Sequence, residues 1–274
     1  MEKKNHTPSP PSRPNALRME QLSIGYTGRH GAATVVASAL NGTLSCGEMT
    51  CLVGPNGVGK STLLRTIAGL QRPLAGQVSI GGIDIGTMSR QQKALAVAVV
   101  LTDTALTTSM TAAEVVALGR SPYTNFWGTL TDNDRHIIRE AMEQVGIPSL
   151  AQRPIQALSD GERQKVMIAK ALAQQTPVLL LDEPTAFLDF NSRIDILLLL
   201  RRLAHEQQKA VLLSTHDLQL CLWTADQLWC LDQQATLTTG TPDYLATAGV
   251  IGQMIAADGV SFDPIAMQIN LNKT

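Results

Sequence analysis

A glycine-rich run that ends in lysine and serine is the part of this sequence best suited to do chemistry. It fits the pattern G-x-x-x-x-G-K-[ST] and comprises Gly54, Pro55, Asn56, Gly57, Val58, Gly59, Lys60 and Ser61. Glycines let such a loop curl until its backbone N–H groups face a phosphate, and the positive end of a following helix also favours an anion. A lysine at this position reaches the β- and γ-phosphates, and the hydroxyl after it holds Mg²⁺. The run predicts a nucleoside triphosphate site with Lys60 in catalysis and Ser61 as a metal ligand.

The residues on either side of the loop distinguish a phosphate site from an ordinary glycine-rich turn. Met49–Val53 is an apolar run typical of a strand, and apolar residues recur with helical spacing through Lys60–Leu70. A strand before the loop and a helix after it form the context that this pattern requires. The order therefore favours nucleotide binding, and Thr62 is counted with the loop among the nucleotide contacts.

Two acidic residues close a second apolar strand. Asp182 and Glu183 follow Val178–Leu181, which has the continuous apolar character of a central parallel strand. Ligands of parallel sheets bind at the carboxyl ends of the strands, so these acids are expected near the phosphate loop. There Asp182 would hold Mg²⁺ through water, and Glu183 would orient and deprotonate an attacking water. The alternative is a solvated acidic turn before Pro184, which the phosphate loop upstream disfavours.

A third site gives the sequence its resemblance to the ABC ATPase family. Leu158, Ser159 and Gly161 match that family's LSGGQ signature, whereas Asp160 and Glu162 depart from it. Ser159 and Glu162 also have the spacing of a capping box that opens a helix. The resemblance implies that Ser159 and Gly161 contact the γ-phosphate of ATP. Asp160 adds a negative charge there, which a helix N-terminus tolerates if the carboxylate turns away.

Further residues match the family in the family's order. Tyr26 occupies the place of the aromatic residue that stacks on adenine, and Ala186–Asp189 resembles the loop that crosses the dimer interface, with Asp189 beside the nucleotide. His216 resembles the histidine that contacts the γ-phosphate, which implies a catalytic role. Taken alone, Tyr26 would be a strand-end aromatic and His216 a structural histidine. The resemblance, which covers about residues 17–242, favours the functional roles.

One family residue is replaced. Where the family has a glutamine that approaches Mg²⁺ and reports the nucleotide state to the membrane partner, spacing back from Met110 and Thr111 gives Thr102, followed by Asp103. Thr102 has a shorter reach but keeps a hydroxyl. It is therefore assigned as a metal ligand, with a bridging water or Asp103 as the alternatives.

Strand and helix patterns alternate on both sides of a helix-rich segment. The predicted strands include Leu95–Leu101 and Ala235–Thr239. Alternation of this kind predicts an α/β fold with a mainly parallel sheet. Together with the resemblance it implies a P-loop NTPase core that has an N-terminal antiparallel β portion and a helical subdomain inserted at about residues 103–175.

The ends of the chain differ in character from this core. Residues 1–16 are rich in Pro, Ser, Asn and Lys and predict a disordered tail. Residues 17–242 are expected to form the ABC ATPase domain, and residues 243–274 a C-terminal extension whose role the sequence does not indicate.

Composition and charge exclude several classes of protein. The 274 residues carry a formal net charge of −1, with 16% charged and 44% hydrophobic residues, which indicates a globular protein without the basic excess of a nucleic-acid binder. No apolar run approaches the roughly 18–20 residues that span a bilayer, and the N-terminus lacks the apolar stretch of a secretory signal. The four cysteines show no CxxC spacing, which indicates free thiols in a reducing compartment. These features predict a cytoplasmic protein.

The resemblance also implies partners. Two copies would face head to tail, with ATP and Mg²⁺ between Lys60 of one copy and Ser159 and Gly161 of the other. The pair would drive transmembrane permease subunits as a peripheral component on the cytoplasmic face of the inner membrane. Leu118–Pro122 resembles the LGRxP stretch of importers for iron–siderophore complexes, haem and vitamin B12, which implies a periplasmic or surface substrate-binding protein as an indirect partner. Iron–siderophore import is favoured on family frequency, with haem or vitamin B12 import as the alternatives.

Three other functions stay open at this level. A soluble ABC ATPase of translation or DNA repair would usually have two cassettes or a long coiled coil, and a basic patch. A non-catalytic nucleotide-binding module would result if Thr102 and Asp160 had abolished turnover, although Lys60, Glu183 and His216 are intact. An exporter subunit is only modestly disfavoured by the LGRxP resemblance.

Overall fold

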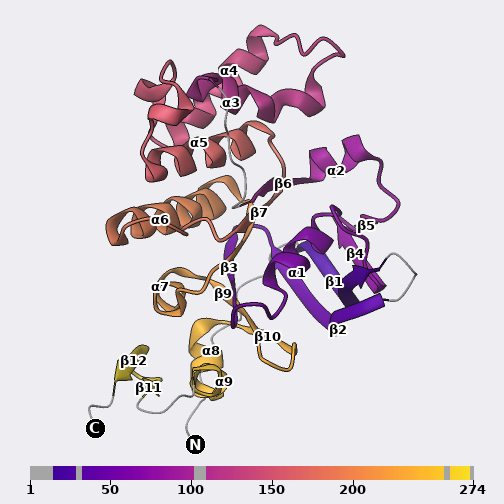
Figure 1. Ribbon diagram of the computed structural model, residues 1–274, viewed down its shortest axis with the longest axis vertical. Helices are drawn as coiled ribbons and strands as arrows, with labels where there is room; N and C mark the ends of the chain where they lie inside the picture. The colour runs from indigo at the N-terminus through magenta and orange to yellow at the C-terminus, as the bar shows by residue number, and fades with distance from the viewer. Residues whose placement is uncertain (1–14, 29–32, 102–108, 256–259, 272–274) are drawn as a thin grey trace, which may run out of the picture.

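A six-stranded sheet forms the centre of the molecule in a computed structural model that describes residues 15–28, 33–101, 109–255 and 260–271. Its strand order is β10–β9–β3–β8–β7–β6 (Figure 1). Neighbouring strands from β9 to β6 are parallel, and β10 runs antiparallel to β9 at one edge. The bounds are β3 (Glu48–Val53), β6 (Val97–Val100), β7 (Val178–Asp182), β8 (Ala210–Ser214), β9 (Gln227–Leu231) and β10 (Leu237–Gly240). The mainly parallel α/β core predicted from the sequence is confirmed.

The central strands are apolar throughout because both faces of the sheet are covered. Every residue of β7 and β8 is buried. Leu179 and Leu181 belong to a core shared with α6 (Phe190–Gln207), whereas Leu180 belongs to a second core shared with α1 (Lys60–Ile67). Successive side chains of a strand point to opposite faces, so a continuous apolar run is what a strand between two cores requires.

A second, four-stranded sheet lies beside the first and has the order β2–β1–β4–β5. All its pairings are antiparallel, which confirms the predicted N-terminal β portion. Its strands are β1 (Asn15–Thr27), β2 (Ala33–Ser45), β4 (Ala75–Ile80) and β5 (Ile83–Asp84). The expectation of a disordered tail over residues 1–16 is wrong for its last two residues. Asn15 and Ala16 open β1, since Ala16 is buried and its carbonyl accepts a hydrogen bond from Gly81 N (3.0 Å).

Helices inserted between β6 and β7 form a separate layer at the top of Figure 1. They are α3 (Ala112–Ala117), the 3₁₀ helix η1 (Leu118–Tyr123), α4 (Asp132–Gln144), the 3₁₀ helices η2 (Pro148–Leu150) and η3 (Ile155–Ala157), and α5 (Asp160–Ala173). Capping boxes open α3, α4 and α5, with Thr111, Thr131 and Ser159 as the N-cap residues. None of the helices in the described part of the chain is long and apolar enough to cross a membrane.

The strand predicted at Leu95–Leu101 is shorter than its apolar run. α2 (Arg90–Ala96) takes the first two residues of that run, and β6 begins at Val97. A capping box sets the helix: Gln92 N donates to Ser89 Oγ (3.2 Å), and Ser89 N donates to Gln92 Oε1 (2.8 Å). These local bonds outweigh the strand preference of the residues that follow.

The C-terminal part of the chain packs on the same core as the sheet. β10 begins at Leu237 and not at the predicted Ala235, because Ala235 has a φ of 59° in a turn. Leu245 and Ile251 are fully buried in the core that contains β3 and β9. The elements after the sheet are α8 (Pro242–Thr247), α9 (Val250–Met254), β11 (Val260–Asp263) and β12 (Gln268–Leu271), with α7 (Leu218–Thr224) between β8 and β9.

Arg120 of the LGRxP stretch connects several elements of the insertion. Arg120 is 3% exposed, and its Nε donates to Asp134 Oδ1 (2.9 Å) while its Nη1 donates to Ala173 O (2.7 Å) and Gln175 Oε1 (3.0 Å). The guanidinium also lies 3.8 Å from the centre of the Tyr123 ring. Arg120 therefore joins η1, α4 and the end of α5, and this motif has a structural role within the insertion.

Candidate active site

The glycine-rich loop connects β3 to α1 in a conformation that its glycines make possible. Gly59 has a φ of 113°, and a Cβ there would lie 2.5 Å from Val36 Cγ1. A Cβ on Gly54 would lie 2.3 Å from the carbonyl oxygen of Leu231. Any side chain at these two positions would collide with the sheet, so the loop can lie this close to β2 and β9 only with glycine.

Lys60 lies folded against the loop that precedes it. Its ammonium donates hydrogen bonds to the carbonyl oxygens of Gly54 (2.8 Å) and Pro55 (3.0 Å), and the residue is 6% exposed. Burial lowers the pKa of Lys60, while the negative charges of Glu183 and Asp182 oppose that shift. The ammonium is thus held inside the loop by neutral oxygens, where a phosphate would be a stronger, charged partner.

A chain of hydrogen bonds joins the loop to the acidic end of β7. Ser61 Oγ donates to Asp182 Oδ1 (3.0 Å), and Ser214 Oγ donates to the same oxygen (2.7 Å). Glu183 N in turn donates to Ser214 Oγ (2.9 Å). The carboxyl ends of two parallel strands therefore meet the start of α1, as the sequence predicted for Asp182 and Glu183.

Ser214 is a site residue that the sequence reasoning missed. It is fully buried at the end of β8 and lies directly opposite Asp182 in the strand register. The sequence did contain a signal for Ser214, because it is a polar residue at the end of an otherwise apolar strand. Its hydroxyl both holds the Asp182 carboxylate and fixes the backbone of Glu183.

Glu183 and His216 face one another across the open side of this network. His216 Nδ1 lies 3.4 Å from Glu183 Oε2, and their side chains are 58% and 29% exposed. Glu183 has a φ of 47°, a left-handed conformation that is costly for a residue with a side chain. Such strain persists where the surrounding structure holds it and is concentrated at functional sites. A carboxylate and an imidazole are thereby presented to solvent beside the phosphate loop.

Tyr26 joins the same region from β1. Its hydroxyl lies 2.7 Å from Thr62 Oγ1, and the residue is 52% exposed. An aromatic side chain is thereby placed beside the start of α1, as the prediction for Tyr26 and Thr62 requires. Thr102 and Asp103, proposed as metal ligand and alternative, lie outside the described residues.

The residues present fit a nucleotide with Mg²⁺. A Cβ on Gly57 would meet no atom within 4 Å, so the outer side of the loop is open beside Lys60. Ser61 and Asp182 offer a hydroxyl and a carboxylate, the oxygen donors that Mg²⁺ prefers. Among the described residues, no group of three or more His, Cys, Asp or Glu is arranged to hold a metal ion by itself. Mg²⁺ usually takes only one or two protein carboxylates and completes its shell with water and phosphate.

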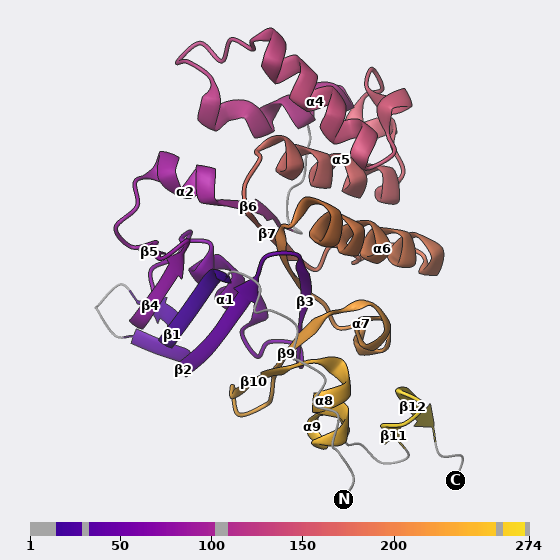
Figure 2. The ribbon, with the colours of Figure 1, turned by 180° about the vertical axis from the view of Figure 1, so that it is seen from behind.

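The signature residues and Asp189 lie together in a different place. Ser159 Oγ accepts from Glu162 N (3.3 Å), and Asp189 accepts two hydrogen bonds from Ser192. A Cβ on Gly161 would lie 3.3 Å from Ser192 Oγ, so the first turns of α5 and α6 are adjacent. Figures 1 and 2 both show α5 on the far side of β6 and β7 from α1. The signature helix α5 therefore lies apart from α1, the helix that follows the chain's own glycine-rich loop.

The Asp160 carboxylate has a partner of its own. Its Oδ1 lies 3.2 Å from Arg163 Nη1, one turn along α5. Asp160 is exposed, so the pair is weak, but it places a positive charge beside the carboxylate. This charge offsets the negative charge that distinguishes this signature from the family pattern.

Comparisons with known proteins identify the family of the chain. A family model described as "ABC transporter" matches residues 37–186. The iron(3+)-hydroxamate import ATP-binding protein FhuC of Bacillus subtilis is 38% identical over 94% of this chain and 97% of its own. The achromobactin transport ATP-binding protein CbrD of Dickeya dadantii is 37% identical over 89% of this chain and 88% of its own. The cobalamin import ATP-binding protein BtuD of Halobacterium salinarum is 39% identical over 80% of this chain and 55% of its own.

A solved structure shares the fold. The ATP-binding cassette MJ0796, in a dimeric post-hydrolysis state bound to ADP and Pi, superposes with a TM-score of 0.70 at 25% identity, over 82% of this chain and 98% of that one. The chain belongs to the ABC transporter family, in which it is an ATP-binding, ATP-hydrolysing subunit.

Proposed function

We propose that this chain hydrolyses Mg²⁺-bound ATP as half of a homodimer and thereby drives uptake of an iron–siderophore complex through a separate membrane permease. The observation that carries the proposal is the chain of hydrogen bonds from Ser61 through Asp182 and Ser214 to Glu183. It joins the glycine-rich loop to a carboxylate that could hold Mg²⁺ and to a candidate base in one network.

Each side chain of the network has a role in this proposal. Lys60 would leave its carbonyl partners to bind the β- and γ-phosphates, and Ser61 and Asp182 would hold Mg²⁺, which neutralises charge on the phosphates. Glu183 would take the proton of the attacking water, with His216 close enough to orient its carboxylate and to contact the γ-phosphate. Catalysis of this kind is mainly positioning and charge stabilisation. Thr102 is retained as the proposed third metal ligand.

The location of the signature supports a second copy as the partner. Because α5 lies on the far side of β6 and β7 from α1, Ser159 and Gly161, with Asp189 beside them, would act on a nucleotide held by the other copy. Phe187, in the loop before Asp189, is 89% exposed. In the proposed dimer, burial of this ring against the second copy would remove apolar surface from water. The dimeric state of the MJ0796 cassette supports the same arrangement.

The transport role extends this proposal to the membrane. The ATPase domain would comprise residues 15–242, with the helical subdomain at about 103–175, and would sit peripherally on permease subunits at the cytoplasmic face of the inner membrane. A substrate-binding protein would act through that permease. The 243–274 extension packs on the core by Leu245 and Ile251.

The names of the relatives and the lengths over which they match support an iron–siderophore cargo. Those named for iron(3+)-hydroxamate import and achromobactin transport match nearly their whole length, whereas the one named for cobalamin import matches over 55% of its own. Iron–siderophore uptake is therefore preferred to haem or vitamin B12 uptake. Deletion of the gene should abolish growth on an iron–siderophore complex as the sole iron source and leave growth on vitamin B12 unchanged. The opposite pattern would assign the cobalamin cargo.

An ATPase assay tests the enzymatic part. The purified chain should release phosphate from ATP with Mg²⁺ and lose this activity when EDTA removes the metal. Equal turnover with and without Mg²⁺ would contradict the roles of Ser61 and Asp182. Nucleotide binding without any turnover would identify the chain as a non-catalytic module.

A further inference from the structure

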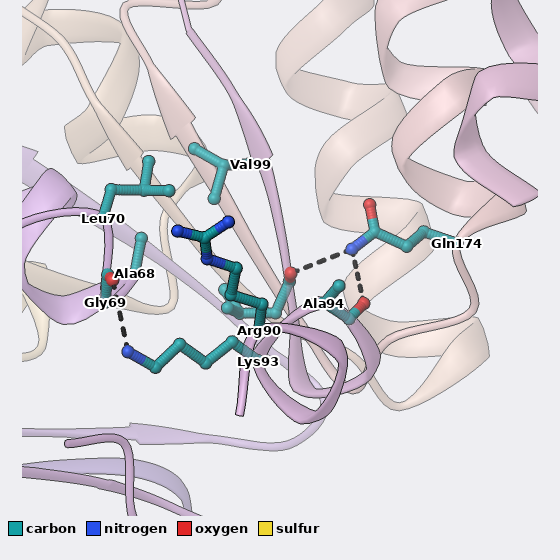
Figure 3. Close-up of a pocket in the computed structure, with 9 residues that line it drawn as sticks. Ala68, Gly69, Leu70, Arg90, Lys93, Ala94, Val99 and Gln174 are labelled. Atoms are coloured by element: carbon teal, nitrogen blue, oxygen red, sulfur yellow. Dashed lines mark hydrogen bonds between the residues drawn. The ribbon is translucent and has the colours of Figure 1, made fainter. Parts of the chain in front are cut away.

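One amide side chain ties the end of α5 to the central sheet. Gln174 is the C-cap residue of α5, and its Nε2 donates to the carbonyl oxygens of Ala94 (2.6 Å) and Val97 (3.0 Å), as Figure 3 shows. Ala94 lies in the last turn of α2, and Val97 is the first residue of β6. Gln174 therefore joins three elements at one point.

The Ala94 carbonyl lies where its helix offers no regular donor, and Val97 lies at the edge of the sheet. Ala94 is among the last four residues of its helix, whose carbonyls have no donor within the helix. Val97 opens an edge strand of the sheet. Gln174 is only partly exposed, so carbonyls that lost this amide would be poorly compensated by water. The two bonds thus hold together the end of α2, the start of β6 and the end of α5.

Other hydrogen bonds between insertion and core are made elsewhere. Gln91 Nε2 donates to Pro122 O in η1 (3.1 Å), and Arg202 Nη2 of α6 donates to Gln144 O at the end of α4 (2.8 Å). Neither involves α5. The side-chain hydrogen bonds of Gln174, in contrast, connect the signature helix α5 directly to the start of β6 in the sheet.

Gln174 lies at the boundary between the inserted helices and the core that contains the sheet. It lines a pocket of about 520 Å³ whose remaining walls come from the segment after α1, from α2 and from β6 (Figure 3). Leu70, Arg90, Lys93 and Val99 are among those lining residues. Gln174 is the contribution of the insertion to this pocket, so its side chain spans the boundary between the two layers.

We propose that Gln174 is a positioning residue for ATP hydrolysis, because it fixes the direction of α5 relative to the sheet. α5 has 14 residues and is therefore about 20 Å long, and Gln174 holds the end opposite to Ser159 and Gly161. If α5 pivots slightly about the end at Gln174, the other end, which carries Ser159 and Gly161, moves by a larger distance than Gln174 does. This inference rests on the proposed function, since it requires the signature to act on nucleotide bound by the second copy at Lys60.

Gln175 provides a matched control one residue further on. Its Oε1 accepts a hydrogen bond from Arg120 Nη1 (3.0 Å), which is a bond within the insertion. Methionine is unbranched and similar in length to glutamine, so Gln174→Met and Gln175→Met each delete an amide with little change in shape. Gln174→Met deletes the link between the insertion and the sheet, whereas Gln175→Met deletes a link that lies within the insertion.

The experiment compares kcat and KM for MgATP in the full-length wild type and both variants. Gln174→Met should lower kcat by about tenfold or more and leave KM within about twofold, because the phosphate loop is untouched. Gln175→Met should keep both constants within about twofold. A merely structural role would instead affect both variants alike, in proportion to their loss of stability measured by urea unfolding.

Three results would overturn the inference. They are a kcat of Gln174→Met within about threefold of the wild type, an equal loss in Gln175→Met, or a loss confined to KM. If Gln174→Met fails to fold, Gln174→Asn replaces it, since it keeps an amide but shortens the reach by one methylene; an unchanged kcat in that variant also overturns the inference. An inactive wild type would contradict the proposed function itself, and the inference with it, and is recognised directly from the wild-type assay.

Discussion

Ser61 Oγ donates a hydrogen bond of 3.0 Å to Asp182 Oδ1, although 121 residues separate the two in the chain. The contact exists because β3 and β7 both deliver their carboxyl ends to the same edge of the sheet, with β8 between them. That edge is where ligands of open parallel sheets bind. The relationship between a loop hydroxyl and a strand-end acid is what would allow this surface to hold phosphate and metal.

Replacing the acid of this pair should remove the metal and spare the nucleotide. Asp182→Asn keeps an oxygen that accepts from Ser61 but loses the charge that we propose holds Mg²⁺. We expect kcat to fall by about 10²-fold or more and the Mg²⁺ concentration for half-maximal activity to rise. Nucleotide affinity measured in EDTA should not change. Asp195→Asn, an exposed acid on α6, is the control and should behave as wild type.

The role of Tyr26 separates into a ring and a hydroxyl. Tyr26→Ala removes the surface proposed to stack on adenine, and the nucleotide Kd should rise by about tenfold or more, since stacking on a base contributes about 1–3 kcal/mol. Tyr26→Phe removes only the bond to Thr62 (2.7 Å) and should change Kd by less than about threefold. Titration with a fluorescent ATP analogue measures both. Equal effects of the two variants would show that the hydroxyl matters and the stacking does not.

Two glycines of the loop should differ in their tolerance of alanine. Gly54→Ala places a methyl group 2.3 Å from Leu231 O, whereas Gly57→Ala meets nothing within 4 Å. Both positions have positive φ, so both variants carry a conformational cost. Gly54→Ala should lower the free energy of unfolding by about 1–3 kcal/mol more than Gly57→Ala, because of the collision. Urea unfolding of both proteins without nucleotide gives the comparison, and equal stabilities would contradict it.

The acid that holds the insertion together predicts a pH dependence of stability. Hydrogen bonds from Thr131, first from its hydroxyl and then from its backbone, together with Arg120 lower the pKa of Asp134 to about 2 from 3.8. A depressed pKa in the folded state gives stability that is complete above about pH 4 and is lost as the pH falls toward about 2.

Asp134→Asn tests this dependence. The stability difference between wild type and Asp134→Asn, measured by urea unfolding, should be largest above about pH 4 and shrink as the pH falls toward 2. Asp132→Asn, an exposed acid in the same first turn of α4, is the control. A difference that does not vary with pH would contradict the role of the ionised carboxylate.

Motifs that combine residue type with local order could be predicted from the sequence. The loop at Gly54, the acids after β7 and the capping boxes at Ser89, Thr111 and Ser159 are each encoded within a few residues. So is the alternation that gives a parallel sheet. Their positions in the structure agree with prediction because backbone hydrogen bonds and turn conformations are decided locally.

Contacts between distant segments could not be predicted in the same way. Ser214 reaches Asp182 only through the strand register, and Gln174 reaches Ala94 only because the insertion folds back on α2. The burial of Arg120 likewise depends on three elements that meet around it. A sequence shows the residue types in such places but not their neighbours, so a polar residue in a helix or at a strand end looks unremarkable until the fold is known.

The most direct test of the account is the behaviour of Glu183→Gln with MgATP, measured as turnover and as mass by sedimentation. The variant should bind ATP, lose turnover by about 10²-fold or more and sediment as a dimer with ATP and as a monomer without it, because the proposed base is gone while the glycine-rich loop and the signature remain. Glu206→Gln, an exposed acid on α6, should keep wild-type turnover. Wild-type turnover in Glu183→Gln, or a variant that stays monomeric with saturating MgATP, would contradict the central claim.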